Sequence, residues 1–230
     1  MRAGRGLGRV WLFDLDNTLH DASHQVFGRI STAFVDYIER ELALPRDEAE
    51  ALRTRYWRRY GATLLGLERH HGVVASHFLN DTHALPGVEL RLSRPDRAAL
   101  SRLPGRKIVL TNAPAIYAQR VLDALGLSRY FEAVVSIEHM RMFGELRPKP
   151  DARSLRFVCA RLGVKPSQCV LVEDSLENQK SARRVGMGTV WMQRFLRGER
   201  HGPGQHVALR RQPGYVDRKI KALAALRRGA

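Results

Sequence analysis

The chain has 230 residues, of which 44% are hydrophobic and 27% are charged. These shares are typical of a soluble globular protein and exclude a disordered or fibrous class, and the length allows a core domain with a smaller inserted one. The 39 Lys and Arg residues exceed the 23 Asp and Glu residues, so a net charge of +16 makes the surface attractive to polyanions, phosphorylated metabolites or anionic membrane surfaces.

The apolar runs of the chain are short. The longest, such as Val10 to Phe13, have the length of a strand and fall far below the ~20 residues that cross a bilayer, so we expect no membrane span and no membrane partner. The apolar stretch near the N-terminus is also too short for the core of a signal peptide. Cys159 and Cys169 lack the spacing of a metal site, and we interpret them as buried thiols of a cytoplasmic protein.

Short apolar segments recur along the chain and predict five strands. They are RVWLFDL near the start, RKIVLTN from Arg106, EAVVSI from Glu132, QCVLVED from Gln168 and GTVWMQ from Gly188. Helical segments separate several of them, and each ends at a glycine: Ala115 to Leu125, Ala152 to Leu162 and Leu176 to Val185. This alternation predicts an α/β fold with a parallel sheet and helices on both faces, in which ligands bind at the carboxyl ends of the strands.

One stretch, from Asp21 to about Leu92, interrupts this alternation. It contains no convincing buried strand, whereas Val26 to Leu42 and Glu48 to Tyr60 have helical apolar spacing. We therefore predict a discontinuous core of residues 1–20 and 93–230 and a helical insertion of residues 21–92. An insertion at this place could close a site from water.

The chain ends in a basic segment that starts at about Arg194. Its basic residues are interrupted by Gly and Pro and are followed by an amphipathic stretch. Because no known nucleic-acid motif accompanies them, we interpret the segment as a solvated surface and tail helix in preference to a nucleic-acid site.

Asp14 and Asp16 lie two residues apart in FDLDNTL, directly after the first predicted strand. In an extended chain both side chains point to the same side. A carboxylate at this place can attack phosphorus, while its neighbour gives a proton to the leaving oxygen and later activates water. Taken alone, the pair is also typical of a solvated turn, so the hypothesis depends on the motifs that follow.

Further polar residues occur where the next strands end. Thr111 and Asn112 follow the run IVL, where a hydroxyl and an amide can bind phosphate oxygens, although the same pair is typical of a turn or a helix N-cap. Lys149 lies between two prolines in RPKPD, which restrict its backbone, so its ammonium group can be held in one direction and offset phosphoryl charge. A lysine in this setting is often only a loop residue.

Glu173 and Asp174 end the fourth predicted strand, in VLVED. Carboxylate oxygens at a strand end are ligands that Mg²⁺ prefers, although Glu-Asp before Ser is also typical of a helix N-cap. All four features occur at sheet ends, in this order and with complementary roles. We therefore interpret them as one site.

The segments FDLDNTL, LTN, RPKPD and VEDSLEN resemble the four motifs of the haloacid dehalogenase superfamily, and together they span nearly the whole chain. The resemblance implies a Rossmann-like core with a helical cap inserted after the first motif. It implies Asp14 as the nucleophile that forms an aspartyl phosphate, Asp16 as general acid and base, and Thr111 and Lys149 on the phosphoryl group.

The same resemblance implies Mg²⁺ as the cofactor. Its ligands would be the Asp14 carboxylate, the Asp16 backbone carbonyl and Asp174, with Glu173 in a supporting place. Within the superfamily, dehalogenases lack an aspartate at the place of Asp16. Phosphomutases share it but usually have Gly where Asn17 stands, so the resemblance favours a phosphatase.

A finer resemblance extends into the insertion. YWRRYGATLLGL from Tyr56, with the segments around the second and fourth motifs, is similar to the pyrimidine 5′-nucleotidase branch, which dephosphorylates nucleoside monophosphates. Tyr60, Gly61 and Thr63 match its cap signature, so Tyr60 and Thr63 are candidate substrate residues, and an aromatic ring there could stack on a base. The alternative is that the aromatic residues only pack the cap helices.

We therefore expect a Mg²⁺-dependent phosphomonoester hydrolase that acts on a small phosphorylated metabolite, in first place a nucleotide. The alternatives are a phosphatase of a sugar phosphate or of phosphoglycolate, a phosphomutase, and a polyanion-binding protein without turnover. The complete acid set of Asp14, Asp16 and Asp174 argues against the last.

Overall fold

The computed structural model describes residues 8–83, 90, 92–196 and 212–227, and the chain divides into two compact units. The first unit holds the described residues up to 21 and from 90 onward, and the second holds residues 22–83. The second unit lies within the stretch that the sequence analysis assigns to the helical insertion. Residues 197–211 of the expected basic tail lie outside the described residues.

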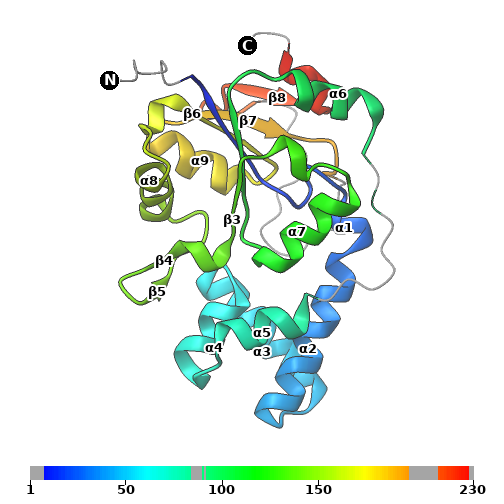
Figure 1. The fold of residues 1–230 in the computed structure, drawn as a ribbon. Helices are drawn as coiled ribbons and strands as arrows, with labels where there is room; N and C mark the ends of the chain where they lie inside the picture. Colours follow the sequence, from blue (N-terminus) through cyan, green and yellow to red (C-terminus); the bar gives the residue numbers. More distant parts are fainter. Residues whose placement is uncertain (1–7, 84–89, 91, 197–211, 228–230) are drawn as a thin grey trace. The chain divides into compact units, whose positions relative to one another are not determined.

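A six-stranded parallel sheet forms the centre of the first unit (Figure 1). Its strands lie in the order β3-β2-β1-β6-β7-β8. Their bounds are Val10–Phe13 for β1, Arg106–Leu110 for β2, Ala133–Val135 for β3, Cys169–Glu173 for β6, Gly188–Met192 for β7 and Arg218–Ile220 for β8. Five of these strands are those predicted from the sequence. The α/β class with a Rossmann-like parallel sheet is therefore confirmed.

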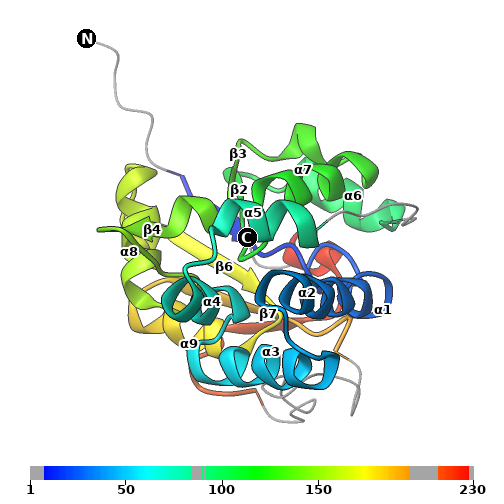
Figure 2. The same cartoon turned by 90° about the horizontal axis from the view of Figure 1, so that it is seen from below.

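Helices cover both faces of the sheet. In the described part of the first unit the α-helices are α6 Arg94–Arg102, α7 Ala115–Ala124, α8 Ala152–Arg161 and α9 Leu176–Arg184. Connections between parallel strands are right-handed, so α6 and α7 lie on one face and α8 and α9 on the other (Figure 2). Shorter elements complete the unit: 3-10 turns η1 Ser128–Tyr130, η2 Ile137–Met140, η3 Pro166–Gln168 and η4 Leu223–Arg227, and the hairpin of β4 Arg141–Met142 and β5 Glu145–Leu146.

The side chains of β1 alternate between the two faces of the sheet. Val10 and Leu12 belong to a buried cluster that also contains Leu155 and Val158 of α8. Phe13 belongs to the other face, where its ring meets Phe131 edge to face at a centroid distance of 5.6 Å. Full burial of each such side chain stabilises the fold by about 1.5–3 kcal/mol, so β1 is fixed in the centre of the core.

The register of the central strands brings their carboxyl ends level. Phe13 pairs with Val109 on β2 and with Val172 on β6. The residues that follow these positions therefore emerge at one edge of the sheet, where the polar motif residues lie.

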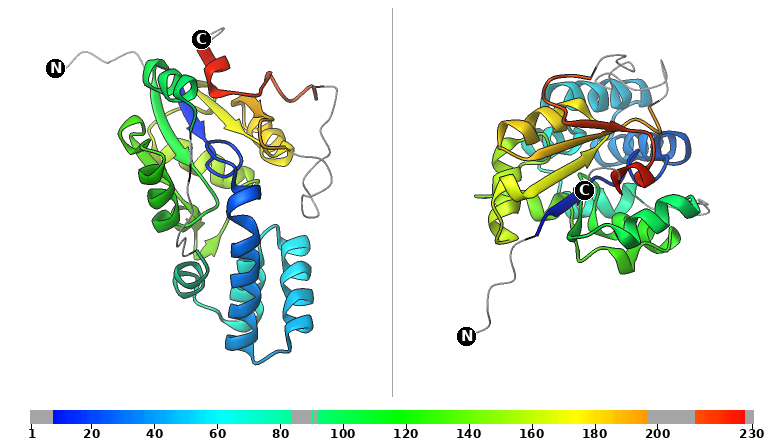
Figure 3. Two further views of the ribbon diagram at one scale, coloured as in Figure 1. Left: turned by 90° about the vertical axis from the view of Figure 1, so that its right-hand side faces the viewer. Right: turned by 90° about the horizontal axis from the view of Figure 1, so that it is seen from above.

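The end of the chain corrects one expectation. Where the sequence predicts a solvated tail helix, the structure has β8 at the edge of the sheet and the 3-10 turn η4, which packs against α6 (Figure 3). Ile220 and Leu226 are buried, and the buried carboxylate of Asp96 accepts hydrogen bonds from Arg194 and from the Ala224 amide. These apolar and charged contacts attach the segment to the core.

The regular elements among the described residues of the second unit are all helices. Its helices are α1 Ala22–Gln25, α2 Phe27–Leu42, α3 Arg46–Tyr60, α4 Thr63–His71 and α5 Ala75–Thr82. A Cβ atom on Gly66 would lie 2.2 Å from the Tyr56 ring, so a glycine lets α3 and α4 approach. Among the described residues, no helix combines the length and the apolar character needed to cross a membrane.

Candidate active site

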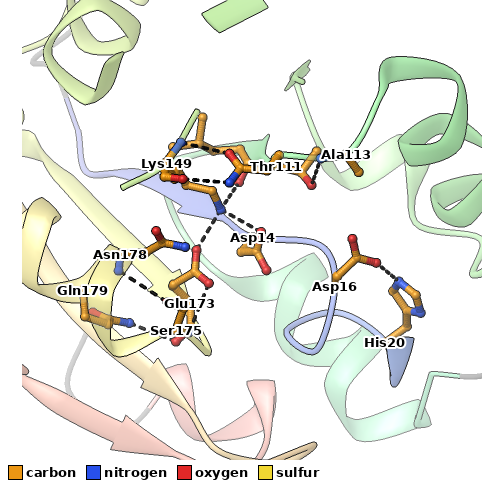
Figure 4. Close-up of polar contacts among 12 residues, drawn as sticks. Asp14, Asp16, His20, Thr111, Ala113, Lys149, Glu173, Ser175, Asn178 and Gln179 are labelled. Carbon is orange, nitrogen blue, oxygen red and sulfur yellow. Dashed lines mark hydrogen bonds and ion pairs between the residues drawn. The ribbon is translucent and has the colours of Figure 1, made fainter. Parts of the chain in front are cut away.

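Asp14 follows β1 directly and is buried, with 6% of its surface exposed. Its amide donates to the Val172 carbonyl at 2.9 Å, which continues the pairing of β1 with β6 by one residue. Its carboxylate Oδ1 accepts a hydrogen bond of 2.7 Å from the ammonium Nζ of Lys149 (Figure 4). The central strand therefore holds Asp14 rigidly at the carboxyl edge of the sheet.

Lys149 is buried and bridges two carboxylates. Its Nζ lies 2.7 Å from Oδ1 of Asp14 and 2.7 Å from Oε2 of Glu173, and it donates to the Leu110 carbonyl at 2.8 Å. All three donor positions of the ammonium group are thus used, which fixes its direction.

Asn112 holds the backbone of Lys149 from the other side. Its amide nitrogen donates to the Lys149 carbonyl at 2.9 Å, and its amide oxygen accepts from the Lys149 amide at 2.9 Å. Both polar atoms of the Asn112 side chain are therefore engaged with Lys149, so the structure gives this residue a positioning task. Its expected contact with phosphate stays a prediction.

Three carboxylates gather around one ammonium group at this edge. Ligand oxygens of Asp14, Glu173 and Asp174 all lie within 4.8 Å of one another. Glu173 is almost fully buried and uses its second oxygen to accept from the Ser175 amide at 3.2 Å, so both of its oxygens have protein partners. The supporting place expected for Glu173 stays a prediction.

Burial and the neighbouring charges shift the pKa values of these groups. Burial, followed by the charge of Glu173, raises the pKa of Asp14 to about 8, against the opposing effect of Lys149. Burial and the same neighbour also raise the pKa of Asp174. Although burial lowers it, the charges of Asp14 and Glu173 raise the pKa of Lys149 overall. Burial and repulsion between the carboxylates therefore both oppose the ionisation of Asp14 and Asp174.

This donor set fits a divalent cation. Three carboxylates and one ammonium carry a net charge of −2 when all are ionised, and hard oxygen ligands of this kind are those that Mg²⁺ prefers. Asp14, Glu173 and Asp174 are the residues whose carboxylates could hold the ion. The expected ligand set, in which the Asp16 backbone carbonyl joins Asp14 and Asp174, stays a prediction.

Asp16 turns away from this cluster. Its Oδ1 accepts a hydrogen bond of 2.6 Å from the Tyr117 hydroxyl and lies 2.9 Å from Nε2 of His20. In Figure 4 Asp16 and His20 lie apart from the Lys149–Glu173 pair, on the other side of Asp14. The Asp16 side chain is 19% exposed, whereas those of Lys149 and Glu173 are 2% exposed. Asp14 and Asp16 thus have different surroundings, and Asp16 is the more accessible to solvent.

Thr111 is buried at the end of β2. Its hydroxyl oxygen accepts from the Ala113 amide at 3.0 Å, and its own amide donates to the Val135 carbonyl of β3 at 3.0 Å. A hydroxyl that accepts one hydrogen bond keeps its own hydrogen, so Thr111 can still donate to an anion.

The two candidate substrate residues of the second unit have partners within that unit. The Thr63 hydroxyl is buried and donates to the Arg53 carbonyl at 3.2 Å. The Tyr60 hydroxyl is bonded to Nε2 of His70, and the Tyr60 and Tyr56 rings lie 5.9 Å apart. These contacts agree with the alternative that both residues support the packing of α3 on α4, and their role toward substrate stays a prediction.

The model of the haloacid dehalogenase-like hydrolase family matches residues 9–186, a range that includes every candidate residue named above. The chain belongs to this family. The match covers more than half of the chain, and it agrees with the superfamily resemblance that the four motifs carry.

Individual members of the family are similar over different lengths. Fructose-1-phosphate phosphatase YqaB of Escherichia coli (strain K12) is 35% identical over 118 residues, which cover 51% of this chain and 56% of that protein. Phosphoglycolate phosphatase of Caulobacter vibrioides is 28% identical over 196 residues, which cover 78% of this chain and 77% of that protein. The matched region thus spans less than two thirds of the Escherichia coli protein.

A solved structure has the same fold. The crystal structure of a phosphatase of this superfamily from Thermococcus onnurineus superposes with a TM-score of 0.59 at 22% identity, and the alignment covers 96% of each chain. At this identity the likeness supports the fold alone.

Two described residues that contact the Asp16 side chain are absent from the sequence predictions. They are His20 and Tyr117, which both contact Asp16. His20 follows Asp16 by four residues, a local signal that could have drawn attention to it. Tyr117 lies 101 residues away along the chain, and only the fold brings it to Asp16.

Proposed function

We propose that this hydrolase cleaves phosphomonoesters through an aspartyl phosphate on Asp14. The observation that carries the proposal is the pair of carboxylates with different surroundings: Asp14 is buried against Lys149, and Asp16 is held by other groups and is partly exposed. Two acids kept apart in this way can take the separate roles of nucleophile and proton donor.

The proposed reaction has two steps. In the first, an oxygen of Asp14 forms a bond to phosphorus, the bond from phosphorus to the ester oxygen breaks, and protonated Asp16 gives its proton to the departing alcohol. In the second, Asp16 takes a proton from water as the water oxygen attacks phosphorus. The bond to Asp14 then breaks, and inorganic phosphate leaves.

The other residues of the site stabilise charge in both steps. Lys149 offsets the negative charge of Asp14 and of the phosphoryl oxygens, and the Thr111 hydroxyl donates to one of those oxygens. Mg²⁺, when bound by Asp14 and Asp174, would reduce the repulsion between the carboxylate and the anionic substrate.

We further propose a small polar substrate, a sugar phosphate or phosphoglycolate. The reported relatives are named for fructose 1-phosphate and phosphoglycolate, so their names favour this alternative of the sequence analysis over a nucleoside monophosphate. The Tyr60 and Thr63 hydroxyls are hydrogen-bonded to His70 and to the Arg53 carbonyl. These contacts give no support to recognition of a nucleobase by the two residues.

A panel of phosphate esters tests the proposed activity and substrate class. Fructose 1-phosphate, phosphoglycolate, UMP and p-nitrophenyl phosphate would be incubated with the protein and Mg²⁺, and free phosphate would be measured. We expect fructose 1-phosphate or phosphoglycolate to have a higher kcat/KM than UMP. If UMP leads, the nucleotidase prediction stands and the proposed substrate class is wrong. Isomerised sugar phosphates without free phosphate would instead indicate a phosphomutase.

The metal site is tested by stability rather than by turnover. Mg²⁺ at about 100 times its dissociation constant should raise the unfolding free energy of the wild-type protein by ~2.7 kcal/mol, because the ion binds only the folded chain. Asp174→Asn should lose most of this gain, measured as the shift in Tm with added Mg²⁺.

Glu132→Gln is the matched control for this measurement. Glu132 is a carboxylate beside the start of β3, paired with Arg106, and its loss should leave the Mg²⁺ response intact. Equal Tm shifts in wild type and Asp174→Asn would contradict the assignment of Asp174 to the metal.

A further inference from the structure

A second polar cluster surrounds the carboxylate of Asp16. The Tyr117 hydroxyl and Nε2 of His20 both contact the same oxygen, Oδ1, at 2.6 and 2.9 Å. Tyr117 has no exposed surface and His20 is 1% exposed. Within the described residues, Oδ2 of Asp16 accepts no hydrogen bond. One oxygen of the carboxylate is thus fixed, and the other remains for a reacting group.

The backbone places both partners rigidly. Asn17 has a φ of 58°, which turns the chain after Asp16, and the Leu19 amide donates to the Leu15 carbonyl at 2.9 Å. This turn allows the backbone bridge between Asp16 and His20. Tyr117 lies in the first turn of α7, and its ring lies 6.5 Å from that of His20 between centroids.

The hydrogens of this cluster can be assigned from the contacts. Nδ1 of His20 is buried and has no hydrogen-bond partner among the described residues, so a hydrogen on Nδ1 would find no acceptor there. A hydrogen on Nε2 instead points at the carboxylate oxygen Oδ1 of Asp16, which accepts it. Burial and the charge of Asp16 raise the pKa of Tyr117, so the phenol also keeps its hydrogen. Both contacts are then donations to Oδ1.

We propose that Tyr117 and His20 are positioning residues that fix the Asp16 carboxyl group so that Oδ2 carries the proton to the leaving oxygen. Two donors on one oxygen prevent rotation of the carboxyl group and reserve the other oxygen for the substrate. This inference rests on the proposed function, in which Asp16 is the general acid. Neither residue contacts the phosphoryl-binding groups Lys149 and Thr111 in a hydrogen bond among the described contacts.

The test compares substrates that differ in their need for a proton donor. An alkyl phosphate needs protonation of its leaving oxygen, whereas p-nitrophenyl phosphate has a good leaving group and needs it little. Tyr117→Phe and His20→Leu should each lower kcat for the best alkyl phosphate by about tenfold or more, with a much smaller loss for p-nitrophenyl phosphate and a nearly constant KM.

Two variants serve as matched controls. His20→Gln places an amide N–H near the position of Nε2 and should restore most of the alkyl phosphate activity that His20→Leu loses. Tyr37→Phe removes another buried tyrosine hydroxyl, one that is bonded to His77 at 2.9 Å in the second unit, and should leave the ratio of alkyl to aryl activity unchanged.

Asp16→Asn, measured alongside, separates this inference from the proposed function. If Asp16→Asn changes the alkyl-to-aryl ratio but Tyr117→Phe and His20→Leu do not, the positioning role is wrong and the proposed reaction stands. If Asp16→Asn also leaves the ratio unchanged, both are wrong. Should His20→Leu fail to fold, as judged by its thermal unfolding, Tyr117→Phe decides alone because it keeps the ring.

Discussion

Replacing Asp14 with Asn is expected to lower kcat by ~10⁴-fold or more while the protein stays folded. The amide has nearly the shape of the carboxylate, and its oxygen can still accept the hydrogen bond from Nζ of Lys149. An amide is a poor nucleophile, however, so the first step of the proposed reaction should nearly stop. Steady-state phosphate release and urea unfolding, measured on the same sample, check the two halves of this expectation.

The control for this prediction is Asp123→Asn. Asp123 is an exposed carboxylate of α7 that accepts hydrogen bonds from Gln119 and Ser128, and its replacement should leave kcat unchanged. Mass spectrometry of the Asp14→Asn protein would exclude deamidation, which restores aspartate. Near-normal turnover in a sample free of deamidation would refute the nucleophile assignment.

The second large effect is expected for Lys149→Met. This change keeps the length and apolar part of the side chain but leaves Asp14 and Glu173 without their shared ammonium group. Removal of one partner from a buried ion pair costs about 3–5 kcal/mol, so urea unfolding in excess chelator should show a loss of roughly this size. The kcat should fall by ~10²-fold or more, because charge stabilisation of the phosphoryl oxygens is lost.

A double variant separates this charge effect from a packing effect. Glu173→Gln removes one of the two carboxylates that Lys149 neutralises, so the Lys149→Met/Glu173→Gln protein should be more stable than the sum of the single losses implies. Lys107→Met is the control, since the Lys107 ammonium donates to the Leu103 and Gly105 carbonyls and has no carboxylate partner in the described part of the chain. Strictly additive losses would show that the contact between Lys149 and Glu173 contributes little.

Much of the core could be predicted because local pattern and fold agree. The strands β1, β2 and β6 are buried on both faces of the sheet, so their sequences contain continuous apolar runs. Such runs predict strands from composition alone. The strand β8 was missed because its three residues, Arg218–Ile220, carry two basic side chains and pair at the sheet edge. Tertiary contacts, rather than local pattern, place it there.

The sequence predicts which residues form the site more completely than it predicts the contacts between them. Parallel topology requires the strand ends that carry Asp14 and Asp174 to meet at one edge, and the structure brings them together. Sequence pattern could not reveal that Asn112 holds the Lys149 backbone, because this contact depends on the path of the loop between the two motifs. The contact of Tyr117 with Asp16 likewise depends on where the fold places α7.

The prediction that Tyr60 and Thr63 contact substrate depended on residue type alone. Thr63 begins α4, and its hydroxyl has a nearby backbone acceptor, the Arg53 carbonyl of α3. A threonine in that place stabilises the junction of two helices whether or not a ligand contacts it. A signature of this kind therefore fits a packing role as well as a binding role.

The most direct test of the central claim is chemical trapping on Asp14. Borohydride reduces an aspartyl phosphate to homoserine, so wild-type protein quenched with borohydride during turnover of its best substrate should contain homoserine at position 14, detected by peptide mass spectrometry. The conversion should require both substrate and Mg²⁺ and should be absent in Asp14→Asn. An unmodified Asp14 during rapid phosphate release, or trapping at another residue, would contradict the proposed mechanism.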